Sequence, residues 1–139
     1  AKLRARRNGV SIFEPKVIEG SKTIKRLKES ADRLLLDVPC SGLGVLRRNP
    51  DTKWKLSPES IQKVQETQQE ILQSYPSMLK KGGQLVYATC SILPSENEEQ
   101  VKKFLASEAG KDFELIEDRK VLAQESGFDG FYIARLLKK

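Results

Sequence analysis

Apolar positions fall into short runs and helical repeats, and these predict the elements in the first third of the chain. Residues 10–13 alternate apolar and polar side chains, as a short strand does. Residues 23–31 repeat apolar side chains at helical spacing, and residues 33–38 form a continuous apolar run typical of a buried parallel strand. A strand, a helix and a second strand are therefore expected before the Pro-Cys pair at 39–40.

A long amphipathic helix is expected after a turn-rich loop. Ser57 and Pro58 suit the N-cap and the first position of a helix. Apolar residues then follow one helix face, with Gln68 as the one polar interruption. Pro76 is expected to kink the last turns, and the glycine pair at 82–83 to end the helix.

The last part of the chain predicts three strands and one more helix. Residues 84–89 form a further buried strand, and Ser95 and Glu98 have the spacing of a capping box that opens a helix. Residues 113–116 and 131–137 are predicted as two final strands. This order, with its short connections, predicts an α/β fold: a mostly parallel sheet flanked by helices that ends in an antiparallel pair.

Length and composition limit the class of protein. The chain has 139 residues, 38% of them hydrophobic, which fits one domain. Its longest apolar runs have four residues, whereas a membrane span needs roughly 20. We therefore expect a cytoplasmic protein without membrane association. The basic residues before Gly9 have the pattern of the last turns of a helix entered midway, so the chain is expected to be a fragment.

Basic residues are concentrated in two places. The net charge is +6, and residues 1–28 hold nine basic and two acidic side chains, which gives this segment +7. A second basic cluster surrounds Trp54 in the loop at 47–55. Such a composition suits contacts with phosphates and stacking on bases, so a polyanionic partner is expected. The alternative is that these charges form solvated helix faces.

The chain has two cysteines and no histidine. Structural zinc sites need about four Cys or His ligands, so no metal site is expected, and Ser-His or Cys-His nucleophile pairs are excluded within these residues. Asp37 and Cys40 follow one predicted strand and Cys90 follows the next, at the sheet edge where open α/β folds bind ligands. Two thiols and a carboxylate are thus expected to face one cleft. Taken singly, each cysteine also suits a small buried apolar position.

Four segments carry a family resemblance: LLDVPCSGLG at 35–44, LRRNPDTKW at 46–54, GQLVYATCSILPSENE at 83–98 and DGFY at 129–132. Together they resemble the RNA cytosine-5 methyltransferases of the Nol/Sun family, bacterial ribosomal RNA enzymes in particular, from about residue 10 to the end. The resemblance implies a Rossmann-like, S-adenosylmethionine-dependent methyltransferase sheet. Residues 1–139 are then the C-terminal part of one catalytic domain.

The resemblance also implies roles for three residues. Cys90 is the nucleophile that adds to C6 of cytosine, and Cys40 assists release of the methylated product. DNA enzymes use the Pro-Cys cysteine as nucleophile instead, so Thr89 beside Cys90 favours RNA. Asp37 is expected near the target base and the methyl end of the cofactor; the alternative is a carboxylate that caps a nearby turn.

The resemblance implies S-adenosylmethionine as cofactor, yet the glycine-rich loop that binds it in this family is not among these residues. The segment at 42–44 has two glycines but not the spacing of a phosphate-binding loop. The remaining candidates for cofactor contacts are Asp37 and Glu19. We therefore expect this chain to be inactive alone.

RNA, in particular ribosomal RNA, is the expected partner, with Arg47, Arg48 and Lys53 as candidate contacts to the RNA backbone or the flipped nucleotide. A rival hypothesis is a non-catalytic, basic RNA-binding module whose cysteines are core residues. A third is self-association, because a partial sheet exposes an edge and apolar surface.

Overall fold

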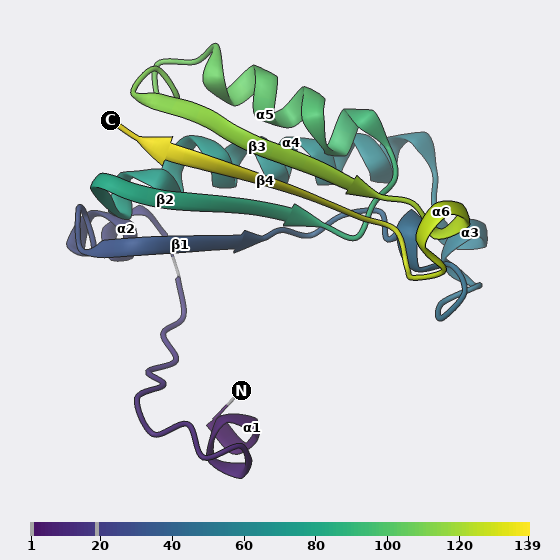
Figure 1. The fold of residues 1–139 in the computed structure, drawn as a ribbon, viewed down its shortest axis with the longest axis horizontal. Coiled ribbons are helices and arrows are strands. Elements are labelled where there is room, and N and C mark those ends of the chain that lie inside the picture. The colour runs from purple at the N-terminus through teal and green to yellow at the C-terminus, as the bar shows by residue number, and fades with distance from the viewer. Residues whose placement is uncertain (1, 19) are drawn as a thin grey trace.

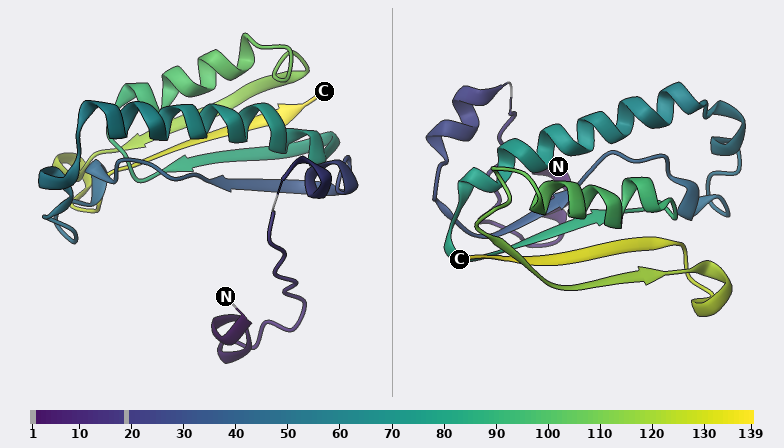
Figure 2. Two further views of the ribbon diagram at one scale, coloured as in Figure 1. Left: turned by 180° about the vertical axis from the view of Figure 1, so that it is seen from behind. Right: turned by 90° about the horizontal axis from the view of Figure 1, so that it is seen from above.

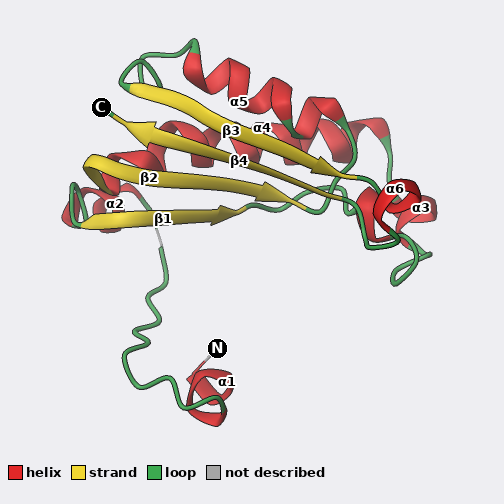
Figure 3. Cartoon of the chain, viewed as in Figure 1, coloured by secondary structure: helices red, strands yellow, loops and turns green. Residues whose placement is uncertain are grey.

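The computed structural model describes residues 2–18 and 20–139. Within this part, four strands form one mixed sheet with helices packed along it (Figures 1 and 3). The strands are β1 (Ala31–Asp37), β2 (Leu79–Thr89), β3 (Phe113–Val121) and β4 (Phe131–Lys138). The helices are α1 (Lys2–Arg7), α2 (Ser21–Arg26), α3 (Thr52–Lys55), α4 (Pro58–Ser74), α5 (Glu98–Leu105) and α6 (Ala123–Ser126).

The order of the strands in the sheet is β1-β2-β4-β3. β1 and β2 are parallel and are joined through α4, as the sequence predicted. The expected antiparallel pair of β3 and β4 is also present, and β4 lies between β2 and β3, antiparallel to both. Because β1 and β2 run side by side in the same direction, the loops after them meet at one edge of the sheet.

The core lies between one face of the sheet and the helices α4 and α5, which run along that face (Figure 2). Leu72 of α4, Leu85 of β2 and Phe104 of α5 are completely buried there. The aromatic rings of Phe104 and Phe113 pack with centroids 5.3 Å apart. Burial of these side chains supplies the main stabilisation of the fold.

The predicted strand at residues 10–13 is absent, because this segment has no neighbouring strand to receive its backbone hydrogen bonds. It is part of a loop that leads away from the sheet to α1 (Figure 3). Ile12 in this loop is 91% exposed. The expected helix end at Gly9 is confirmed: α1 stops at Arg7, and Gly9 adopts a left-handed φ of 70°.

Two other boundaries differ from the predictions. The helix expected at 23–31 is the shorter α2, because Ser30 already donates its N–H to the Met78 carbonyl and starts the approach to β1. α4 ends at Ser74, well before the glycine pair at 82–83. A 3-10 turn at Tyr75–Met78, which contains Pro76, follows α4, and the glycines lie inside β2.

The predicted capping box at Ser95 is wrong. A 3-10 turn at Pro94–Glu96 precedes α5, whose N-cap is Asn97 and has no side-chain capping bond. The Ser95 hydroxyl instead accepts a hydrogen bond from Gln65 of α4 at 2.9 Å. The helix starts later than expected because the side chains of Glu96 and Asn97 turn into the protein. In the described part of the chain, no helix has the length and apolar character to cross a membrane.

Candidate active site

The two cysteines meet at the edge where β1 and β2 end. Cys90 directly follows β2, and Cys40 lies three residues after Asp37, the last residue of β1. Their Sγ atoms are 3.2 Å apart, and both thiols are free and partly buried. The predicted approach of the two cysteines is thus present in the fold. A contact this short lets one thiol donate a hydrogen bond to the other sulfur.

The environment of Cys40 keeps its thiol protonated. Burial above all, and then the contact with Cys90, raise the pKa of the Cys40 thiol to about 12. At neutral pH the Cys40 thiol therefore keeps its proton, and either sulfur can be the donor in the contact with the other. Cys40 therefore suits a proton-holding role better than that of an attacking thiolate.

A fully buried carboxylate lies between the loops that follow the cysteines. Glu96 has no exposed surface. Its Oε1 accepts the backbone N–H of Ser41 at 2.8 Å, and its Oε2 accepts the hydroxyl of Ser41 at 2.5 Å and that of Ser91. Gln68 of α4 donates to Oε1 at 3.2 Å. Sequence analysis did not single out Glu96; the available signal was Gln68, a polar residue on an otherwise apolar helix face.

A second buried polar contact closes the loop after β2. The hydroxyl of Thr89 donates to Oδ1 of Asn97 at 2.5 Å, and Nδ2 of Asn97 donates to the Ser91 carbonyl at 3.0 Å. The side chains of all three residues are essentially buried. The backbone on both sides of Cys90 is therefore held by side chains from the segment that leads into α5.

Asp37, the third predicted catalytic residue, lies apart from this polar cluster. Its side chain is exposed, and it points to the sheet face opposite Leu36 and Val38, which are buried. It pairs in register with Ala88, two residues before Cys90. Asp37 is thus at the correct end of β1 but makes no side-chain bond to either cysteine among the described residues. Glu19, the other predicted cofactor contact, lies outside the described residues.

The loop that carries the predicted RNA contacts is anchored beside Cys90. The Gly44 N–H donates to the Cys90 carbonyl at 2.9 Å, and the Gly44 carbonyl accepts from the Gly130 N–H at 2.7 Å. A Cβ at Gly44 would lie 2.1 Å from the Gly130 carbonyl oxygen, so this close crossing requires glycine. The crossing fixes the loop against the strand end that positions the nucleophile candidate.

The three predicted RNA contacts differ in how they are held. Nε of Arg48 bonds to the buried Asp129 carboxylate at 2.6 Å while most of the Arg48 side chain stays exposed. Arg47 is exposed as well. The Lys53 ammonium lies 5.0 Å from the ring centroid of Trp54, whose side chain is 81% exposed. The side chains of all three residues are exposed.

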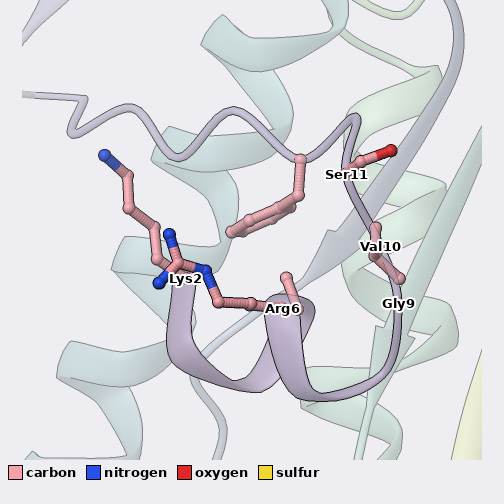
Figure 4. A pocket seen from close by; sticks show the side chains of 7 residues that line it. Lys2, Arg6, Gly9, Val10 and Ser11 are labelled. Atoms are coloured by element: carbon pink, nitrogen blue, oxygen red, sulfur yellow. The ribbon is translucent and has the colours of Figure 1, made fainter.

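Two cavities differ in their relation to the cysteines. One of about 450 Å³ lies between α1 and the following loop and is lined by Lys2, Arg6, Val10 and Ser11 among others (Figure 4). It contains none of the candidate site residues. A smaller cavity of about 260 Å³ is lined by the loops at 43–47 and 123–130 and by Ile92, two residues after Cys90. Only this second cavity adjoins the candidate site.

Comparison with known proteins agrees with the geometry. A family model described as 16S rRNA methyltransferase RsmB/F matches residues 5–137. Ribosomal RNA small subunit methyltransferase B of Vibrio vulnificus (strain YJ016) is 48% identical over 115 residues, which cover 80% of this chain and 27% of that protein. The chain therefore spans about a quarter of the length of the curated relatives it matches.

Solved structures give the same result. PH0851 superposes with a TM-score of 0.90 at 31% identity, covering 99% of this chain and 33% of that one. A methyltransferase homologue from Pyrococcus horikoshii superposes with a TM-score of 0.79 at 28% identity, covering 99% and 48%. The sheet is thus the Rossmann-like methyltransferase sheet that the sequence predicted. With its two cysteine motifs and the family match over residues 5–137, the chain belongs to the 16S rRNA methyltransferase family RsmB/F.

Proposed function

We propose that this chain is the part of a cytoplasmic RNA methyltransferase that carries the reactive cysteines, and that the complete enzyme forms 5-methylcytosine in ribosomal RNA. One observation carries the proposal: Cys40 and Cys90 lie with their Sγ atoms 3.2 Å apart at the carboxyl edge of two parallel strands. Membership of the RsmB/F family supports RNA as the methyl acceptor.

In the proposed reaction, Cys90 makes cytosine C5 nucleophilic. Its thiolate forms a bond to C6, and the electron pair of the C5–C6 double bond becomes available at C5. S-adenosylmethionine, when bound, supplies the methyl group. A base, for which solvent water suffices, then takes the C5 proton; the C5–C6 double bond re-forms and the C6–S bond breaks, which releases the Cys90 thiolate. Covalent addition thus replaces one difficult step by several easier ones.

Cys40 acts beside the adduct rather than in its formation. Its raised pKa keeps a proton on Sγ, within reach of the sulfur that must leave C6. A protonated thiol 3.2 Å away stabilises the departing Cys90 sulfur by a hydrogen bond. This contact supports the proposed roles, with Cys40 in product release and Cys90 as the nucleophile.

Among the described residues, Asp37 is the candidate contact to the cofactor. The exposed Asp37 carboxylate at the end of β1 suits hydrogen bonds from the amino group of the cofactor or from the ring edge of the base. No glycine-rich cofactor loop occurs in this sequence. We propose that residues 1–139 form the C-terminal part of the catalytic domain and do not bind S-adenosylmethionine tightly alone.

The basic loop beside Cys90 is the proposed RNA contact. Arg48 is held through Nε by Asp129, which leaves its other N–H groups for a phosphate. Arg47 on the same loop and Lys53 in the short helix α3 that follows it add positive charge. Chemistry on a base requires that the nucleotide leave its stack, and a cationic rim beside the thiols suits the backbone of such a nucleotide.

The test uses the complete protein that contains this chain and an RNA substrate with radiolabelled methyl donor. Cys90→Ala should abolish methyl transfer, because no other group in the site adds to C6. Cys40→Ala should retain the first transfer but turn over slowly. Full turnover by Cys90→Ala would refute the proposal, and salt-sensitive RNA binding by the unaltered complete protein without any methyl transfer would support the RNA-binding module instead.

A further inference from the structure

We propose that Glu96 is a positioning residue: its buried carboxylate joins the loops after β1 and β2 and thereby sets the distance between the Cys40 and Cys90 sulfurs. The inference rests on the proposed function, in which these two cysteines carry the reaction. Glu96 makes no hydrogen bond to either cysteine sulfur among the described residues, so it acts through the residues beside them.

The surroundings of Glu96 are built for a carboxylate. A carboxylate without exposed surface is costly unless hydrogen bonds replace its water. Here Glu96 accepts from four neutral donors: the N–H and hydroxyl of Ser41, the hydroxyl of Ser91 and the amide of Gln68. Packing alone would be served by an apolar side chain, so this arrangement indicates a role in geometry.

The two serines connect Glu96 to the cysteines directly. Ser41 follows Cys40, and Ser91 follows Cys90. Each hydroxyl gives its proton to Glu96. The Ser91 hydroxyl also accepts the N–H two residues later, at 3.1 Å, so it fixes its own turn as well. Since both hydroxyls bond the same Oε2, a single oxygen fixes the relative positions of the two cysteine-bearing turns.

Gln68 ties the same carboxylate to helix α4. Its Nε2 donates both to the Pro39 carbonyl, just before Cys40, at 2.9 Å and to Glu96 at 3.2 Å. The opposite amide orientation would place Oε1 against two acceptor oxygens. These two acceptors therefore require that the amide nitrogen of Gln68 faces them. The polar residue that interrupts the apolar face of α4 therefore anchors the Cys40 loop and Glu96 together.

The test measures the closeness of the two thiols directly, on this chain and without RNA or cofactor. In a glutathione buffer, the dithiol and oxidised glutathione give the Cys40–Cys90 disulfide and two reduced glutathiones; the two thiols are oxidised and the glutathione disulfide is reduced. The equilibrium constant reports how well the fold holds both sulfurs together. Glu96→Gln should lower it about tenfold, equivalent to about 30 mV.

A matched control separates positioning from general loss of a buried polar group. Gln69 is buried and donates to Gln100 between α4 and α5, with no bond to the cysteine loops. Gln69→Met should leave the equilibrium constant within about twofold of the parent. Circular dichroism confirms that each variant is folded before the equilibrium is read.

Two variants that each remove one hydrogen bond to Glu96 serve as the test if Glu96→Gln does not fold. Ser41→Ala and Ser91→Ala each remove one hydroxyl from Oε2 and should each lower the constant by about threefold. An unchanged constant in Glu96→Gln, or in both serine variants, would overturn the positioning role. That outcome is distinct from failure of the proposed function, which shows as methyl transfer without Cys90.

Discussion

The two faces of the sheet share the same strands but differ in what covers them. On one face, α4 and α5 bury Leu85 and Phe104 completely. On the other face, Leu35 of β1 is 66% exposed and Ile133 of β4 is 43% exposed, although both are apolar. The alternation of side chains along each strand thus produces one face whose cover this chain provides and one face that its described residues leave open.

The same division runs through the candidate site. Cys40, Cys90 and the carboxylate of Glu96 are held from the covered side, by the loops that lead into α4 and α5. Asp37, the candidate cofactor contact, belongs to the open side. This difference agrees with the proposal that this chain holds the two thiols and that residues outside it bind most of the cofactor.

The largest expected effect is the loss of stability when a large apolar side chain on the covered face, rather than on the open face, is replaced by alanine. Phe104→Ala removes a fully buried ring and should lower the free energy of unfolding by about 3–5 kcal/mol. At concentrations where the chain is monomeric, Leu35→Ala should change it by less than about 0.5 kcal/mol, because Leu35 is already largely in water. Urea denaturation followed by circular dichroism measures both. Equal losses would mean that the open face is covered in solution.

The next effect is the pH dependence of the covered edge. Burial raises the pKa of Cys40 from 9.0 to about 12, so the unfolded chain loses this proton first as pH rises. The contribution of Cys40 to the free energy of unfolding is therefore fully present below pH 9 and should be lost progressively up to about pH 12. Cys40→Ala should flatten this decline. A decline of the same slope in Cys40→Ala would assign it to other groups.

The open face offers a weaker, intermolecular effect. We expect the chain to self-associate through Leu35 and Ile133, as bare apolar surface does. Leu35→Lys combined with Ile133→Lys should raise the dissociation constant about tenfold. Sedimentation velocity over a range of concentrations measures this. A matched exchange at Leu3 of α1, which is 83% exposed but away from the sheet, should have little effect.

The smallest effect concerns the basic loop. Lys53→Ala should weaken RNA binding by about threefold at moderate salt, since it removes one phosphate contact. For the same reason, the slope of the logarithm of the binding constant against the logarithm of the salt concentration should fall in magnitude by about one. Asp129→Asn should have a similar effect through Arg48, whose guanidinium it releases. Fluorescence anisotropy at several salt concentrations measures both. Unaltered binding in both variants would place the RNA elsewhere on the molecule.

Regular, locally encoded features were predictable from the sequence. The continuous apolar runs of β1 and β2, the Ser57-Pro58 start of α4 and the meeting of both cysteines at one edge are all confirmed. Predictions failed where distant residues decide. The strand expected at 10–13 lacks a neighbouring strand, and the helix after Ser95 starts later because Glu96 and Asn97 are drawn into the site.

The role of Glu96 was hidden for the same reason. A glutamate in a polar stretch gives no local sign of burial, and two of its three partner residues lie 28 and 55 positions away. Gln68 was the one visible signal, because a polar residue on a buried helix face needs a partner. Polar interruptions of an apolar face are thus a sequence signal for buried hydrogen-bond networks.

The central claim is that Cys90 attacks the base and Cys40 assists its release. The most direct test is to incubate the complete protein carrying Cys40→Ala with substrate RNA and methyl donor, and to locate the covalent RNA adduct by peptide mass spectrometry. Because Cys90 forms the bond to the base and Cys40 is needed for its release, the adduct should accumulate on the peptide that contains Cys90. An adduct on Cys40 in the Cys90→Ala variant, with none on Cys90 in the Cys40→Ala variant, would contradict it and exchange the two roles.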